Sequence, residues 1–165
     1  MKVSSSGIVD GIILDKYGKR GEQFNTAGMA TYSIPIKIEN APEETVSYAI
    51  VLDDKDSVPV CGFVWIHWLV ADLVRNELGE NESISPSGFV QGATSWYGRG
   101  GGLSAVESSV YGGMAPPNSP HTYEIHVYAL DTKLGLKTGF FLNELYKAMD
   151  GHVLDYATLK GTYIN

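Results

Sequence analysis

The chain has 165 residues, of which 44% are hydrophobic, and this size and composition predict one domain over residues 1–165 with one sizeable core. The formal net charge of -7 repels phosphate backbones, so no nucleic-acid partner is expected. There is no apolar run long enough for a membrane-spanning segment and no signal-peptide core, and the single Cys61 cannot form an internal disulfide; a cytoplasmic location is predicted.

The spacing of turn residues indicates a mostly β protein, because glycines and prolines separate short β-branched and aromatic runs. Residues 33–38 contain Pro35, which places that stretch at a sheet edge or at the start of a strand. Residues 47–52 are a compact apolar run that ends in two aspartates, as in a buried strand that delivers carboxylates to its end. Residues 63–73 are apolar on both faces and surround His67, which predicts a central strand with a buried histidine.

The second half of the chain contains one further strong strand pattern and one helix pattern. Residues 74–102 are polar and rich in glycine, which predicts a long connection. Residues 122–130 alternate with the two-residue period of a strand. The apolar spacing after Thr138, with Gly151 as a stop, predicts a helix near the C-terminus. Residues 155–161 are interpreted as a short turn of helix.

Carboxylate, imidazole and phenol side chains near the ends of these strands suggest a binding pocket. In a strand Asp54 and Asp56 project to the same side, so both carboxylates can face one pocket. A carboxylate fixes the tautomer of a neighbouring histidine and favours its protonated form, and His67 and His121 are the candidates. With the hydroxyl of Tyr123, such histidines form a donor-rich pocket for phosphate or carboxylate.

The glycine loop at residues 111–117 suits the rim of such a pocket. Gly112 and Gly113 permit close backbone approach and offer amide donors, and the prolines that follow stiffen the loop. Each signal alone also has an ordinary structural explanation: a solvated Asp-x-Asp turn, a core histidine at His67, or a surface turn in the glycine loop. His126 is interpreted as an outward-facing strand residue. The combination is what argues for a site.

Taken in order along the chain, these elements resemble the phosphatidylethanolamine-binding protein family, also called the Raf-kinase-inhibitor-like family, and specifically its short bacterial branch. Residues 54–59 are similar to the family's Asp-Pro-Asp-Ala-Pro element, and residues 62–72 to the strand that follows it. Residues 111–117 resemble its Tyr-Gly-Gly-Pro-Cys-Pro-Pro loop, and residues 121–131 its His-Arg-Tyr strand. Residues 148–163, near the C-terminus, are also similar to the end of the family's sequence.

This resemblance implies two antiparallel sheets packed as a Greek-key-type sandwich, with a few peripheral helices. It also implies a surface pocket for phosphate-like anions or phosphoryl headgroups. The residues that would line or order the pocket are Asp54, Asp56, His67, His121 and Tyr123, with Gly112 and Gly113 at its rim.

Three departures from the family pattern affect the expected pocket. Lys55 stands where the family usually has proline, Met114 begins the replacement of a Pro-Cys pair, and Thr122 replaces an arginine. Losing the guanidinium removes a charge-assisted donor, whose hydrogen bonds are roughly twice as strong as neutral ones. The sequence therefore predicts weak anion binding.

The leading functional hypothesis is a binding protein for a small phosphorylated or carboxylated ligand, with no catalytic residues, metal or cofactor expected. The alternative is a regulatory protein that binds and inhibits a partner kinase or protease, which rests on analogy of fold. An enzyme or metal site ranks last, because the sequence has no HExxH pair, no clustered cysteines and no Gly-x-Ser-x-Gly elbow. The oligomeric state is left open, a homodimer being one option.

Overall fold

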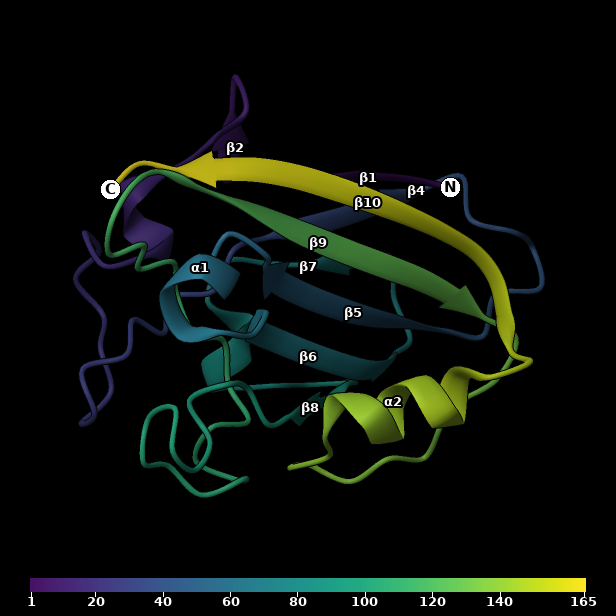
Figure 1. Cartoon of the computed structure of the whole chain (residues 1–165). Helices are drawn as coiled ribbons and strands as arrows, with labels where there is room; N and C mark the ends of the chain where they lie inside the picture. The colour runs from purple at the N-terminus through teal and green to yellow at the C-terminus, as the bar shows by residue number, and fades with distance from the viewer.

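Ten strands form two sheets in the computed structural model, which describes residues 1–165 (Figure 1). The smaller sheet has the order β1 (Lys2–Ser4), β4 (Ile36–Glu39), β7 (Glu77–Leu78). The larger sheet has the order β2 (Ile8–Val9), β3 (Ile12–Ile13), β10 (Val153–Tyr163), β9 (His121–Leu130), β5 (Ser47–Asp54), β6 (Trp65–Leu73), β8 (Val90–Gly92).

The larger sheet has a Greek-key order. Strands β5, β6 and β8 lie side by side, and β9 returns through a long connection to pair with the other side of β5. All pairings are antiparallel except that of β10 with β3, which is parallel and joins Thr162 to Ile12. The predicted mostly β fold with two sheets is therefore confirmed, with this one parallel pairing added.

The helices are few and short, as expected. Helix α2 (Leu142–Met149) confirms the predicted helix near the C-terminus, and the Glu144 carboxylate caps it by accepting the Phe141 N–H at 2.7 Å. Helix α1 (Val58–Cys61) is a single turn between β5 and β6 that ends at Gly62, whose φ of 89° is left-handed. Two 3-10 turns, Asp15–Tyr17 and Glu82–Ile84, complete the list. No helix is long and apolar enough to cross a membrane.

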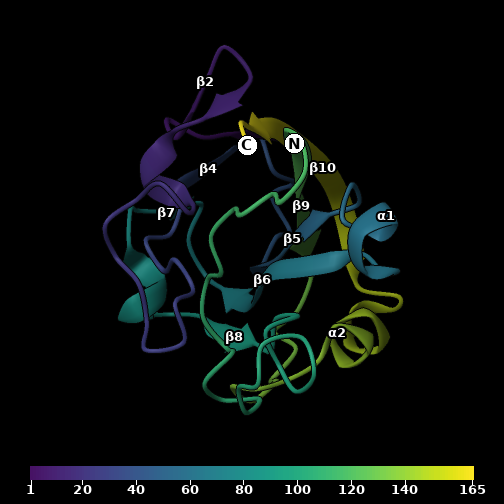
Figure 2. The ribbon, with the colours of Figure 1, turned by 60° about the vertical axis from the view of Figure 1, so that its left-hand side comes forward.

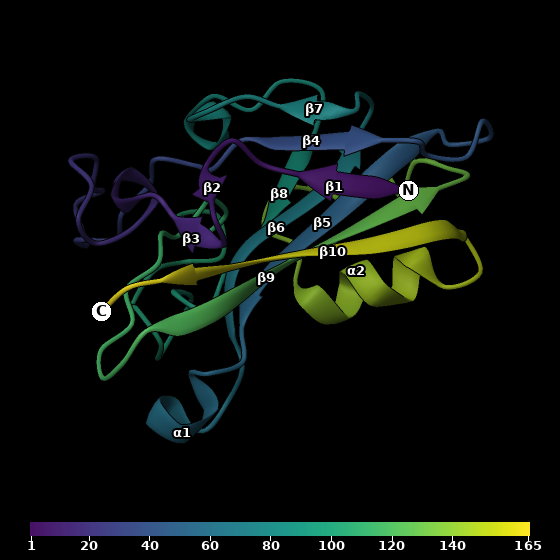
Figure 3. The same ribbon diagram turned by 90° about the horizontal axis from the view of Figure 1, so that it is seen from above.

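Strand β5 is buried on both faces, which explains why its sequence is a continuous apolar run. Ile50 and Leu52 belong to the core shared with the smaller sheet, whereas Ala49 and Val51 pack in a second cluster with α2. Figure 3 shows the smaller sheet on one side of the larger sheet and α2 on the other. The alternation continues to the end of the strand, so Asp53 and Asp54 emerge on opposite faces.

Three expectations about the elements need comment. Residues 155–161 are not helical; they lie in β10, where pairing with β9 along the whole segment overrides any local preference. Pro35 directly precedes β4, so it marks the start of a strand, but β4 is central in its sheet and not at an edge. The connection over residues 74–102 is mostly irregular, with β7 and β8 inside it.

A carboxylate network ties the N-terminal part of the chain to the segment after β7. Glu80 accepts hydrogen bonds from the ammonium of Lys16 at 2.6 Å, from the hydroxyl of Tyr17, and from the hydroxyl of Tyr32 at 3.0 Å. These bonds, that of Lys16 above all, lower the pKa of Glu80 to about 2. An unfolded glutamate titrates near ~4.3, so the network stabilises the fold above that pH and is lost as the pH falls toward 2.

We predict that Glu80→Gln lowers the free energy of unfolding at pH 7 by about 1 kcal/mol, a modest amount because solvent screens this half-exposed group. The difference from the native chain should shrink between pH 4 and pH 2, where the native carboxylate itself takes up a proton. Urea unfolding at several pH values measures this. Exposed Glu44, changed to Gln, serves as the control, and a penalty that is the same at pH 2 as at pH 7 would contradict the linkage.

Candidate ligand-binding site

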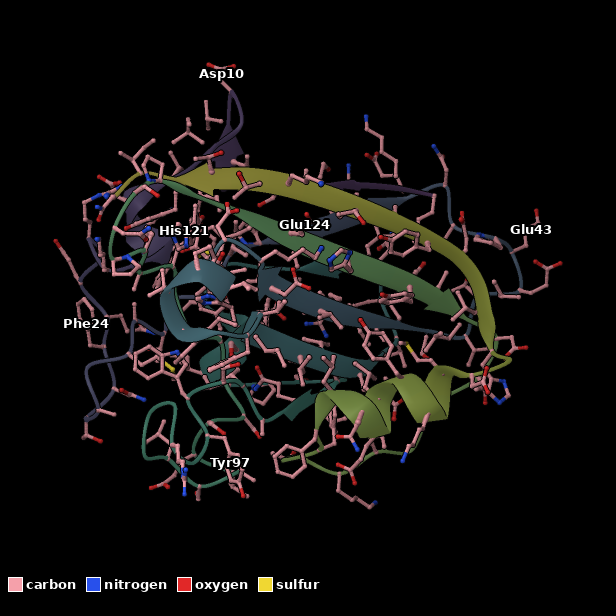
Figure 4. All side chains as sticks on the ribbon, viewed as in Figure 1. Asp10, Phe24, Glu43, Tyr97, His121 and Glu124 are labelled. Carbon is pink, nitrogen blue, oxygen red and sulfur yellow. The ribbon has the colours of Figure 1, made fainter.

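A cavity of about 200 Å³ lies at the end of β5, β6 and β9, beside α1. Figure 2 shows α1 at this end of the strands, and Figure 4 labels His121 beside it. This volume corresponds to about seven water molecules, so a ligand must be small. The polar lining residues are Asp54, Ser57, His67, His121 and Tyr123, and the apolar ones are Val60, Cys61, Trp65, Trp96, Ala115 and Pro117.

Asp54 and His121 form a buried pair in the wall of the cavity. Asp54, the last residue of β5, accepts the Ser57 N–H at 3.1 Å and the Nδ1–H of His121 at 2.7 Å. Both residues are almost fully buried. The other ring nitrogen of His121, Nε2, faces the side-chain oxygen of exposed Asn118 at 2.9 Å. Both ring nitrogens thus face side-chain oxygen atoms of neighbouring residues.

His67 plays a different part from His121. Its Nδ1–H donates to the carbonyl of Gly112 at 2.6 Å, which leaves the lone pair on Nε2. Burial lowers the pKa of His67, so the ring stays neutral near pH 7. The ring also meets the edge of Tyr123 with 5.1 Å between ring centroids. The cavity therefore combines one histidine that can donate and one that can accept.

Two buried donors beside the cavity have no hydrogen-bond partner: the hydroxyl of Tyr123 and Nε1 of Trp96. Burial raises the pKa of Tyr123 well above its usual range, so its hydroxyl keeps its proton. An unpaired buried donor costs about 1–3 kcal/mol. Trp96 was not predicted as a site residue, and the only signal for it was an aromatic pair, Trp96-Tyr97, inside a glycine-rich connection.

An aromatic wall closes the side of the cavity next to α1. Phe63 stacks on Trp65 with 5.6 Å between ring centroids, and Trp65 meets Trp96 edge-on at 5.8 Å. The indoles of Trp65 and Trp96 line the cavity, and Phe63 lies outside the lining, against Trp65. The cavity is thus amphipathic, with polar groups gathered on the strand ends.

The structure does not bring Asp56 into the cavity. Strand β5 ends at Asp54, so the strand alternation that predicted a common side for the two aspartates does not extend to Asp56. Asp56 is exposed and accepts the backbone N–H of Thr122 at 2.8 Å, which fastens the loop to the start of β9.

Gly112 and Gly113 lie behind the cavity wall, and their amides are already used. The N–H of Gly112 donates to the carbonyl of His67 at 2.8 Å, and that of Gly113 to the carbonyl of Ala30 at 2.7 Å. The expectation that these amides face a ligand is therefore wrong. A side chain at Gly112 would collide with the indole of Trp96, so glycine is needed there for close packing. Ala115, farther along the loop, lines the cavity instead.

Lys55, Met114 and Thr122, at the three departures from the family pattern, lie outside the cavity lining, whereas Ala115, the second residue of the replaced pair, is part of it. Lys55 is directed to Glu124, with 2.6 Å between the ammonium and a carboxylate oxygen. Met114 is fully buried, with its sulfur 3.0 Å from the Tyr111 hydroxyl. Thr122 is partly buried at the start of β9 and binds the loop through its amide. No arginine side chain lines the cavity.

Comparison with known proteins identifies the family. The family model described as phosphatidylethanolamine-binding protein matches residues 4–164. The chain belongs to the phosphatidylethanolamine-binding protein family. Members similar to it include the uncharacterized protein YxkA of Bacillus subtilis, 37% identical over 85% of this chain and 86% of YxkA. Another is protein PH1269 of Pyrococcus horikoshii, 35% identical over 99% of this chain and 76% of the relative.

Solved structures of phosphatidylethanolamine-binding protein homologues agree with this assignment. The putative homologue CT736 from Chlamydia trachomatis aligns with a TM-score of 0.79 and 29% identity, covering 99% of this chain and 96% of CT736. Escherichia coli YbcL, described as a new member of the mammalian family, aligns with a TM-score of 0.77. At 20% identity, over 99% of this chain and 98% of YbcL, that likeness shows the fold alone.

Ser57 holds the loop that forms one wall of the cavity. Its Oγ lies 2.6 Å from the carbonyl oxygen of Asp54 and 2.8 Å from that of Phe63, and it accepts the N–H of Trp65 at 2.9 Å. The residue is buried, so removing the hydroxyl leaves these backbone groups short of a partner.

We predict that Ser57→Ala lowers the free energy of unfolding by about 1–3 kcal/mol, because buried polar groups lose their hydrogen bonds. Tryptophan fluorescence should also change, since the loop contacts Trp65. Thermal and urea unfolding followed by fluorescence test both effects. The matched control is Ser87→Ala on the exposed surface, and an unchanged stability in Ser57→Ala would refute the role given to the hydroxyl.

Proposed function

We propose that this family member binds a small anion, namely phosphate, a phosphoryl headgroup or a carboxylate, in the cavity beside α1. The observation that carries the proposal is the donor of His121. Its ring is held by the buried carboxylate of Asp54, and its Nε2 has only the exposed side chain of Asn118 as acceptor. An anionic oxygen that displaces Asn118 would take over this donor.

The charges around the cavity limit its affinity for an anion. The Asp54 carboxylate is buried at the site and repels an anion next to it, so hydrogen bonds from the lining residues must offset this repulsion. His67 supplies no positive charge, because burial lowers its pKa. The missing arginine removes a permanent donor, which supports weak binding. We expect a Kd of about 1 mM, which corresponds to a binding free energy of ~4 kcal/mol in magnitude.

We propose a binding role without catalysis, because the candidate nucleophiles in the cavity are engaged with the backbone. The hydroxyl of Ser57 contacts two carbonyl groups and one amide. The thiol of Cys61 lies 3.4 Å from the carbonyl oxygens of Ser57 and Phe63. Neither group forms a hydrogen bond with His121, whose nitrogens face Asp54 and Asn118.

We predict that phosphate binds saturably at one site per chain, because an anionic oxygen can replace the side-chain oxygen of Asn118 at Nε2 of His121. Calorimetric titration with phosphate, phosphoethanolamine and acetate measures this. His121→Ala should abolish saturable binding. The matched control is His152→Ala, which removes an exposed histidine paired with Asp131 at 2.8 Å and should leave binding unchanged.

Two outcomes would contradict the proposal. One is the absence of saturable binding of all three anions to the native chain. The other is saturable binding that persists in His121→Ala, which would show that the anion binds elsewhere on the protein. Vesicles that contain phosphatidylethanolamine, compared with soluble phosphoethanolamine, distinguish an intact lipid from a free headgroup as the ligand.

A second candidate function, binding to a regulated protein partner, is favoured by apolar side chains around the cavity. Val58, Val60 and Phe63 are exposed on and next to α1. Such a rim suits contact with a protein surface, although the kinase or protease expected from the sequence stays a prediction. A protein partner that binds the His121→Ala variant but no longer binds the Val60→Asp variant would support this function. A partner whose binding is lost in the His121→Ala variant alone would favour the cavity as the binding site.

A further inference from the structure

A second group of chemically active side chains lies on the outer face of the larger sheet, away from the smaller sheet. The outer cluster consists of Asp53 on β5 with Glu124 and His126 on β9, and one ligand atom from each lies within 4.8 Å of the others. Asp53 stands directly opposite Glu124 in the register of the two strands. Figure 4 labels Glu124 on the part of this face that α2 leaves open.

The distances from His126 to the two carboxylates match those around a tetrahedral metal ion. Nε2 of His126 is 3.4 Å from Oδ2 of Asp53 and 3.5 Å from Oε2 of Glu124. Zinc binds imidazole nitrogen and carboxylate oxygen at about 2.0–2.2 Å in tetrahedral geometry, which sets neighbouring ligand atoms roughly 3.3–3.5 Å apart. The imidazole thus already stands at the spacing of a metal site from each carboxylate, and all three ligand atoms lie within 4.8 Å of one another.

The ring of His126 is oriented as in a metal site. Its Nδ1 lies 3.0 Å from the hydroxyl oxygen of Thr158 and 3.1 Å from that of Tyr156, both on β10. An Nδ1–H that donates to these hydroxyls leaves the lone pair of Nε2 directed at the two carboxylates. Metal-binding histidines are usually held in this way by an acceptor at the other nitrogen.

A cation already occupies the centre of the outer cluster. The ammonium of Lys55 lies 2.6 Å from Glu124, 3.7 Å from Oδ1 of Asp53 and 3.4 Å from Nε2 of His126. Carboxylates directly opposite each other on neighbouring strands repel, so the cluster needs such a charge.

The ammonium of Lys55 satisfies the cluster incompletely. Asp53 is only 9% exposed, yet its Oδ1 has no hydrogen-bond partner. The Lys55 side chain, by contrast, is 49% exposed and can turn into water. A smaller, doubly charged ion could therefore replace the ammonium and reach all three ligands.

We propose that Asp53, Glu124 and His126 bind a divalent transition-metal ion of the zinc class, in competition with the ammonium of Lys55. An imidazole combined with carboxylates selects such ions over magnesium and calcium, which prefer oxygen ligands alone. The ion neutralises the two carboxylates, and water fills its remaining position. The site is on the opposite face of β5 from Asp54, so it does not depend on anion binding in the cavity.

The test is a calorimetric titration of the full, untagged chain with zinc chloride in a non-coordinating buffer at pH 7.5. One saturable site per chain is expected. His126→Ala should weaken it at least tenfold, and Glu124→Gln should do the same while nearly preserving the side-chain shape. Lys55→Gln should tighten it about tenfold, because the ammonium in the centre of the cluster is gone, while Lys160 stays 3.0 Å from the outer oxygen Oε1 of Glu124.

Two controls separate the outer cluster from other places where zinc could bind. Lys37→Gln removes a lysine that pairs with Glu39 elsewhere and should leave zinc affinity unchanged. His152→Ala removes an exposed histidine next to Asp131 and should also have no effect. Nuclear magnetic resonance spectra of the imidazole nitrogens should show that zinc changes the chemical shifts of His126. Circular dichroism checks that each variant is folded.

Three outcomes would overturn the proposal. One is the absence of saturable zinc binding in both the native chain and Lys55→Gln. Another is zinc binding that survives both His126→Ala and Glu124→Gln. The third is binding that is lost in His121→Ala, which would place the metal in the cavity. That last result would leave phosphate binding in the cavity as a separate question.

Discussion

The pairing of β5 with β9 is the constraint on which the rest of the molecule depends. In this register Asp53 lies opposite Glu124, and Asp54 lies opposite Tyr123. Because side chains alternate along a strand, the first pair faces outward and the second faces the cavity. A slip of one residue would exchange the two faces of β5 and place Asp53 and Val51 in the sandwich core.

Each of the two aspartates at the end of β5 is accommodated by different electrostatics. Asp54 is buried and accepts hydrogen bonds from a backbone amide and from the imidazole of His121. Asp53 lies among charged side chains, with the ammonium of Lys55 close by and Glu124 opposite. Burying a carboxylate is costly unless it is paired and hydrogen-bonded. The sheet thus balances one carboxylate by hydrogen bonds on the cavity face and the other by an ion pair on the outer face.

Much of the fold could be predicted because its central strands are buried on both faces. The runs that form β5 and β6 are apolar without interruption, and that signal does not depend on knowing the neighbours. Strand β10 was missed because its residues are mostly exposed or half-buried, and its conformation comes from pairing with β9. The residues of β10 alone do not indicate which strand it pairs with.

The site was predictable only in part, for a related reason. His67, His121 and Tyr123 lie on strands whose phase can be read from the sequence, and the structure places all three in the cavity lining. Asp56 falls after the strand has ended, where alternation no longer applies. Whether the amide of Gly113 is free depends on Ala30, more than eighty residues earlier in the chain. No local pattern reports such a contact.

The placement of positive charge decides what the cavity can select. Lys55 follows Asp54 directly in sequence, but its ammonium lies on the opposite face of the sheet, where it pairs with Glu124 and Asp53. No lysine or arginine side chain lines the cavity, and burial lowers the pKa of the lining histidine His67. The lining therefore provides no permanent positive charge to balance the buried carboxylate of Asp54. The hydrogen-bonding groups that it offers are the imidazole and hydroxyl groups of His67, His121 and Tyr123. Membership of the family defines the scaffold, and this local distribution of charge determines how the scaffold can be used.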